Sequence, residues 1–289
     1  CGYERPSYSH FTSMAYWHTG TPNGGDEFGW MGRTADVMRS KQAEDILINV
    51  GSTQSLAVKS AIHTPLVFDD PMRFQRSYWM NQIDFSSSVE PSHKNSNREF
   101  LKAVDVSAKT SAKRIRNAWS DYETNVDYGI VPMDLPKVAS CIDAGLETQL
   151  YHVSFRNNAF DTHVQQPNLH RRLLSYASDA IFGFVNDLQR LGHGDRVVVM
   201  VYSEFGRRVP ENANLGTDHG SANNMFFIGN KVNGGHYGVL PSLVNLIDSG
   251  NLGYTTDFRQ VYATAIEDWL KVDSTKVLKG SFERLPVFT

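Results

Sequence analysis

The chain has 289 residues, of which 40% are hydrophobic and 20% are charged, and its formal net charge is −3. This composition is typical of a globular protein, and so small a charge gives no reason to expect nucleic acid or another polyion as a partner. No stretch reaches the ~18 consecutive apolar residues that a membrane-spanning helix needs.

The first residues, CGYERPSYSH, contain no apolar core of the kind that signal peptides have, and there is no initiator methionine. We therefore expect the chain to begin inside a longer precursor or to be a fragment. Cys1 and Cys141 are equally compatible with a disulfide in an oxidising compartment and with two unpaired thiols.

The first half of the chain predicts few regular elements. Residues 45–62 have the pattern of two short strands with a turn at Gly51. Residues 98–122 carry apolar positions at helical spacing and predict a helix. The surrounding polar stretch, about 68–137, predicts a cap or insertion within a single domain that spans residues 1–289.

The second half alternates strands and helices. Residues 148–155 and 224–229 predict strands, and residues 168–191 and 257–272 predict amphipathic helices. The run RVVVMVY at 196–202 is typical of a parallel strand that is covered on both faces. This alternation predicts an open, mostly parallel α/β sheet with helices on both faces.

Ligand sites in such sheets form beyond the carboxyl ends of the strands. Five candidate metal ligands flank the predicted strands: Asp161 and His163 after 148–155, Glu204 after 196–202, and Asp218 and His219 before 224–229. Carboxylates with neutral imidazoles suit zinc and related divalent ions. Taken singly, each residue is also compatible with a solvated turn, a cap, or an ion pair with Arg207 or Arg208.

Ser9 is a candidate nucleophile in the segment SHFTSMAYWHTG. It precedes a predicted helix, whose amino terminus favours anionic groups such as phosphate or sulfate. On spacing alone, a plain helix N-cap is the favoured interpretation of Ser9.

Several segments together carry a family resemblance: SHFTSMAYWHTG, GWMGR, FDTHVQQ, VVVMVYSEFGRRVPEN, GTDHGSANNMFFIGNKVNGGHYG and TTDFRQVYATAIEDWL. In this order they resemble the bacterial "domain of unknown function 1501" family. That family is placed in the alkaline phosphatase-like superfamily, with the sulfatases and cofactor-independent phosphoglycerate mutases. The resemblance implies an alkaline phosphatase-like fold and a periplasmic or extracellular location.

The resemblance also implies roles for individual residues. Ser9 resembles the superfamily's nucleophile, and Asp161, His163 and His219 resemble ligands of a first metal. The superfamily usually has an Asp-His pair for a second metal where this chain has Glu204 and Phe205, so Phe205 replaces the imidazole. Asp218 has no counterpart in the superfamily. The superfamily's first strand, with its bridging Asp, is absent before Ser9, so we expect a gap or a foreign strand in the sheet next to residues 196–202 or next to the neighbouring strand.

The implied function is a metal-dependent hydrolase of phosphate or sulfate esters, with zinc the best match and calcium, manganese or magnesium as alternatives. Arg207 or Arg208 would bind the anionic group of a small ester substrate by bidentate contacts. The alternative is a non-catalytic binding or structural module on a degenerate fold of the same kind. A serine hydrolase is disfavoured, because Ser203 lies in YSEFG and not in a Gly-x-Ser-x-Gly turn.

Overall fold

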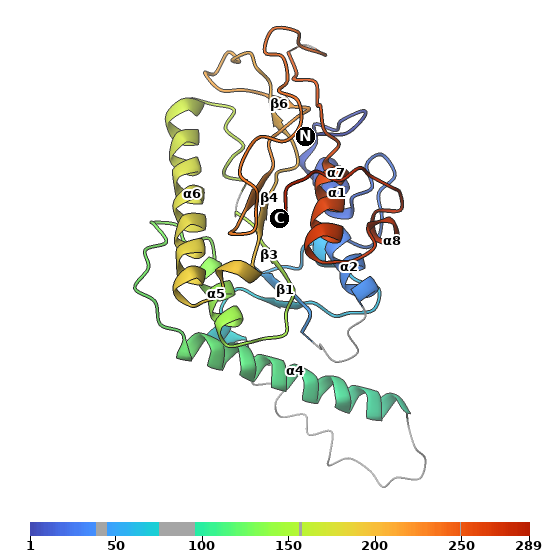
Figure 1. Cartoon of the computed structure of the whole chain (residues 1–289), viewed down its shortest axis with the longest axis vertical. Helices are drawn as coiled ribbons and strands as arrows, with labels where there is room; N and C mark the ends of the chain where they lie inside the picture. The colour runs from blue at the N-terminus through green and yellow to red at the C-terminus, as the bar shows by residue number, and fades with distance from the viewer. Residues whose placement is uncertain (39–44, 75–95, 156–157, 249) are drawn as a thin grey trace.

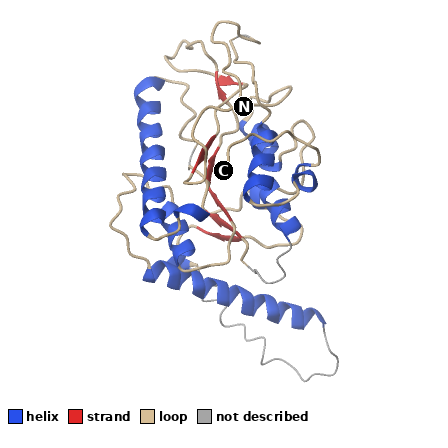
Figure 2. Cartoon of the chain, viewed as in Figure 1, coloured by secondary structure: helices blue, strands red, loops and turns tan. Residues whose placement is uncertain are grey.

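The computed structural model shows helices on both sides of a short column of strands (Figures 1 and 2). It describes residues 1–38, 45–74, 96–155, 158–248 and 250–289. The helices are α1 (His10–Thr19), α2 (Trp30–Met38), α4 (Ser96–Asp121), α5 (Leu135–Asp143), α6 (Gln166–Arg190), α7 (Phe258–Thr264) and α8 (Ser274–Leu278). The strands are β1 (Leu47–Val50), β2 (Leu66–Phe68), β3 (Leu150–Val153), β4 (Val199–Val201), β5 (Gly206–Arg207), β6 (His219–Gly220) and β7 (Phe226–Ile228).

Three strands form a parallel sheet in the order β2-β1-β3. Ile48 of the fully buried β1 is paired with Leu66 on one side and with Tyr151 on the other. The predicted strand at 148–155 is confirmed as β3. The prediction of two strands within 45–62 is wrong for the second one, because the chain after β1 forms a short 3-10 helix, η1 (Leu56–Val58), with Ser55 as its cap.

The strand at 196–202 differs from the parallel, fully covered strand that the sequence predicts. Its central part, β4, pairs antiparallel with β7 in a separate two-stranded sheet, so it is not a parallel strand. Residues 197–202 are all half-buried and not covered on both faces. A cavity of about 1750 Å³ is lined by residues of both β3 and β4. The expected gap of a missing first strand stays a prediction.

The two long predicted helices are confirmed as α4 and α6, each within two residues of the expected ends. On α6 the buried stripe contains Leu173, Ala180, Phe184 and Leu188, whereas Leu169 is exposed. The predicted cap or insertion remains a prediction, since residues 75–95 lie outside the described part of the chain. Cys1 and Cys141 are both free thiols.

Aromatic packing fixes α1 against α7, and so fixes the start of α1 at the site described below. The ring of Trp17 stacks on Phe258 at 4.2 Å between centroids, and the hydroxyl of Tyr262 donates to the carbonyl of Trp17 at 3.0 Å. Asp257 begins α7 with a reciprocal capping box that includes Gln260. The predicted helix at 257–272 is thus confirmed through α7 and the π-helical turn η4 (Ala265–Trp269).

A close contact between α2 and the loop after η1 gives a first testable prediction. A Cβ atom added to Gly32 would lie 2.1 Å from the carbonyl oxygen of Lys59. We expect Gly32→Ala to lower the free energy of unfolding by about 2 kcal/mol, because overpacking outweighs the gain in helix propensity. Urea denaturation measures this. Gly24→Ala, whose Cβ would meet only a methyl group at 3.7 Å, is the control, and equal stabilities would contradict the prediction.

A second prediction concerns Asp187, which is fully buried on α6. Burial alone would raise the pKa of its carboxyl group, but hydrogen bonds from Tyr122, Tyr128 and Arg190 hold the pKa below its ordinary value. Because the folded-state pKa is lowered, Asp187 stabilises the folded protein at pH values above its unfolded-state pKa of ~3.9. This stabilisation is lost as the pH falls through the folded-state pKa.

We expect Asp187→Asn to cost about 3 kcal/mol of unfolding free energy at pH 7. The difference from the wild type should shrink as the pH falls below about 4, because the unfolded wild-type chain then takes up a proton at Asp187 while the folded carboxyl group is still ionised, which favours the unfolded state. Urea denaturation at both pH values is the measurement. A loss of the same size at pH 7 and at pH 3 would show that the charge of Asp187 contributes nothing.

Candidate metal centre

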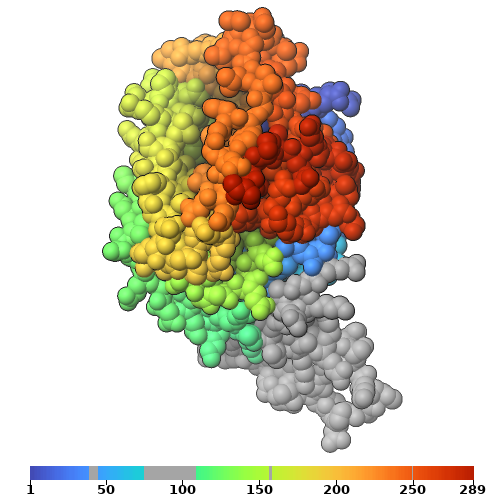
Figure 3. Space-filling model, viewed as in Figure 1, coloured from blue at the N-terminus to red at the C-terminus, as the bar shows by residue number. Residues whose placement is uncertain are grey.

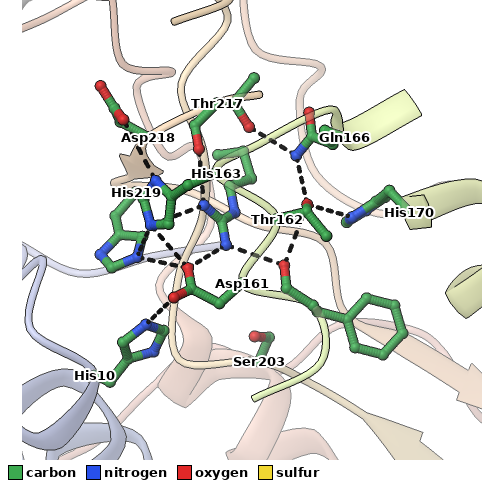
Figure 4. Close-up of polar contacts among 12 residues, drawn as sticks. His10, Asp161, Thr162, His163, Gln166, His170, Ser203, Thr217, Asp218 and His219 are labelled. Atoms are coloured by element: carbon green, nitrogen blue, oxygen red, sulfur yellow. Dashed lines mark hydrogen bonds and ion pairs between the residues drawn. The ribbon is translucent and has the colours of Figure 1, made fainter. Parts of the chain in front are cut away.

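Three distant segments meet beyond the carboxyl end of β3. Asp161 lies in the loop that connects β3 to α6, His219 lies on β6, and His10 is the first residue of α1. β6 pairs with β5, which places His219 opposite Arg207. Figure 4 shows these side chains directed toward the carboxylate of Asp161.

The distances within this group match a small metal site. Asp161 Oδ1 lies 2.9 Å from His219 Nε2, and Asp161 Oδ2 lies 3.2 Å from His10 Nε2. One ligand atom from each of the three residues lies within 4.8 Å of the others. In a tetrahedral zinc site with arms of ~2.1 Å the ligands are about 3.4 Å apart. Two imidazoles and a carboxylate, with a fourth position open, are the arrangement of catalytic zinc sites.

The imidazole rings of His219 and His10 are oriented by hydrogen bonds at their other nitrogens. His219 Nδ1 lies 2.7 Å from the carbonyl oxygen of Tyr8, and His10 Nδ1 lies 2.8 Å from Glu204 Oε1. Both oxygens can only accept, so in the neutral rings the proton is on Nδ1. Each Nε2 then directs a lone pair at a carboxylate oxygen of Asp161, which is repulsive unless a cation lies between them.

His10 Nε2 is buried and has no hydrogen-bond partner in the described part of the chain. A buried nitrogen without a partner is costly, and a metal ion would satisfy it. The three residues therefore fit a divalent ion by their donor types, their spacing and the orientation of their rings.

Arg207 holds Asp161 in place. Its Nη2 donates to Asp161 Oδ1 at 2.5 Å and to the carbonyl of Phe160 at 3.0 Å, and its Nη1 donates to the carbonyl of Thr217 at 2.8 Å. Burial raises the pKa of the Asp161 carboxyl group, but the adjacent imidazoles and the hydrogen-bonded guanidinium of Arg207 hold that pKa well below its ordinary value. Asp161 is thus a carboxylate throughout the neutral range. Since Arg207 contacts the protein itself here, substrate binding by Arg207 stays a prediction.

His163 and Asp218 lie at the edge of this group. His163 Nε2 is 2.9 Å from both Asp161 Oδ1 and His219 Nε2, which makes His163 a candidate fourth ligand. Asp218 is half exposed and contacts His163 Nδ1 at 3.4 Å, and the amide of Asn212 lowers the pKa of its carboxyl group. The structure thus places Asp218 behind His163 and not against Asp161.

Glu204 reaches the centre only through His10. Its second carboxylate oxygen, Oε2, accepts a hydrogen bond from Ser203 at 2.9 Å. Phe205, which follows it, is buried, and its ring stacks on that of His219 at 4.2 Å between centroids. Ser9 is exposed and acts as the N-cap of α1, where its hydroxyl oxygen accepts from the amide of Thr12. Its role as a nucleophile stays a prediction.

His10 is a member of this cluster that the sequence patterns do not predict. It lies beside Ser9 at the first turn of a helix, and it has no spacing to Asp161 or His219 that a pattern could detect. The available signal was its position beside Ser9 at the start of α1.

Parallel strands between two layers of helices, with a cluster of histidines and a carboxylate beyond the sheet, define an α/β protein with a candidate metal centre. The model of a family described as "Protein of unknown function (DUF1501)" matches residues 2–280, so the chain belongs to this family. No curated protein and no solved structure matches the chain. None of the helices among the described residues is both long and apolar enough to cross a membrane.

Proposed function

We propose that this protein is a metal-dependent hydrolase of phosphate or sulfate esters, with an alkaline phosphatase-like fold, that works outside the cytoplasm. The main support is the group of His10, Asp161 and His219, whose ligand atoms lie within 4.8 Å of one another. The fold and the location rest on the resemblance of the sequence motifs. The two imidazoles favour zinc over calcium, manganese and magnesium, which prefer oxygen ligands more strongly.

His10, Asp161 and His219 would hold the ion. If His163 were a fourth ligand, an ester oxygen would have to displace it or bind at a fifth position. When bound, a divalent ion would neutralise charge on the ester oxygens in the transition state. The carbonyl of Tyr8 and the carboxylate of Glu204 orient the two imidazoles through Nδ1, which would leave both Nε2 atoms available to an ion. They act as positioning groups.

Ser9 would supply the nucleophilic hydroxyl. It stands next to His10, is exposed, and caps a 10-residue helix with no acidic residue in its first turn. The free amides and the dipole of such a helix end favour the anionic group of a small ester. The hydroxyl oxygen accepts from Thr12, which leaves the hydroxyl proton free for transfer.

One observation favours a binding or structural module as the alternative. Phe205 stands where a second metal would need an imidazole, and its buried ring stacks on His219. A single metal with no adjacent second ion would leave the leaving group without a counterion, and the fold would then serve to bind an anion without cleaving it.

Metal analysis together with an ester assay separates the hydrolase from the binding module. The purified protein is analysed for bound metals and then assayed on aryl phosphates and aryl sulfates with zinc, manganese, calcium or magnesium added. We expect about one zinc per chain and turnover that a chelator abolishes and zinc restores. Zinc binding without turnover on any ester would favour the binding module. Absence of any bound metal would overturn the proposal.

A further inference from the structure

One exposed segment after β7 is strongly apolar. Between Lys231 and Asp248 the sequence contains no Asp, Glu, Lys or Arg residue. The later part of this segment, residues 239–247, forms an apolar loop. Its large aliphatic side chains that face solvent have exposed fractions from 44% to 86%, and they are Val239, Leu240, Leu243, Val244 and Ile247. Single exposed apolar residues are ordinary on a protein surface, but a group of this density indicates an interaction site.

Hydrogen bonds fix the backbone of the apolar loop, so the exposure of its side chains is built into the fold. The hydroxyl oxygen of Ser242 accepts from the amides of Val244 and Asn245, at 3.3 and 2.9 Å. At the end of the loop, Ile247 and the fully buried Asn251 exchange backbone hydrogen bonds of 2.9 and 2.8 Å. Amides that already have partners cost little to remove from water, which favours entry of the loop into an apolar phase.

The apolar loop is separate from the metal centre and from the large cavity. It belongs to the orange segment at the top of Figure 1, and the space-filling view in Figure 3 shows this segment projecting from the end of the molecule. None of the described residues from 232 to 248 lines the cavity or belongs to the metal cluster. A projecting loop does not enclose a small molecule, so its partner is a surface.

We propose that the apolar loop docks the protein on the surface of a lipid bilayer, with its aliphatic side chains inserted below the headgroups. Such binding depends on the apolar area that is buried and needs no partner of complementary shape. A stable protein interface takes ~20–30 residues from each partner, whereas this loop offers only residues 239–247. The loop also has no charged residue that would pair with a protein partner or with anionic headgroups.

The probe is a set of phosphatidylcholine vesicles, and the measurement is the fraction of protein that floats with them as the lipid concentration rises. We expect reversible binding that is equal at low and high salt, because the loop is uncharged. The double variant Leu243→Ser, Val244→Ser should bind roughly a hundredfold more weakly, since each buried aliphatic side chain contributes about tenfold or more.

The matched control removes two exposed aliphatic side chains from other segments. Ile62 and Ile130 are 63% and 82% exposed, and the double variant Ile62→Ser, Ile130→Ser should bind like the wild type. All four replaced side chains are exposed, so both double variants should keep the thermal midpoint of the wild type when no vesicles are present. Hydrogen exchange at residues 239–247 of the wild type should slow on vesicles.

Three results would overturn the proposal: no flotation of the wild type, an equal loss of binding in the isoleucine control, or release of the protein by high salt. A dimer that light scattering detects in solution, and that the Leu243→Ser, Val244→Ser variant loses, would assign the apolar loop to a second copy of the chain instead. None of these readouts depends on bound metal or on ester hydrolysis, so the result is independent of the proposed function.

Discussion

Replacing His219 with alanine is expected to remove bound metal and ester hydrolysis together. The imidazole of His219 lies 2.9 Å from Asp161 and is held in place by the carbonyl of Tyr8, so its removal deletes one of the three ligands of the cluster. Loss of a direct ligand should exceed the roughly 10–100-fold loss of affinity that follows from changing groups behind a ligand. Metal content after dialysis and turnover on an aryl phosphate are the two measurements.

The geometry predicts an order among the other variants. His10→Ala should act like His219→Ala, whereas Asp218→Asn should weaken metal binding only mildly, because Asp218 contacts the centre through His163. His236→Ala is the matched control, since this histidine is exposed and lies outside the cluster. Full metal content in His219→Ala would exclude this centre as the metal site.

Much of this centre could be predicted from the sequence, because most of its residues lie in loops close to predicted strands. Asp161 and His163 lie in the loop between β3 and α6, and the predicted strand and helix already place this loop at the edge of the sheet. His219 lies opposite Arg207 because β6 pairs with β5. These short-range relations are the ones that strand and loop patterns contain.

Two features could not be predicted in this way. His10 joins the centre only because α1 packs on α7 through Trp17 and Phe258, a contact between segments over 200 residues apart that no periodicity reports. The predicted parallel pairing of β4 is also wrong, because an apolar run indicates burial but not whether the neighbouring strand is parallel or antiparallel. Here the neighbour is β7, and the other edge faces the cavity.

Replacing Ser9 tests the nucleophile, and it needs a control for the helix cap. Ser9→Ala removes the hydroxyl but also the N-cap of α1, which costs about 1 kcal/mol and disturbs the neighbouring His10. Ser9→Asn removes the hydroxyl and keeps the cap, since asparagine caps helices as well as serine does. If Ser9 attacks the ester, both variants should lose turnover by roughly a thousandfold or more.

Metal content in Ser9→Asn should stay near the wild-type level, because the cap is kept and Ser9 is not among the three residues that form the cluster. Loss of turnover in Ser9→Ala alone, with Ser9→Asn active, would mean that the serine acts only as the cap that positions His10. Undiminished turnover in both variants would show that the attacking oxygen comes from water. In that case Glu204→Gln should lower turnover, because the Glu204 carboxylate is hydrogen-bonded to His10 and to Ser203.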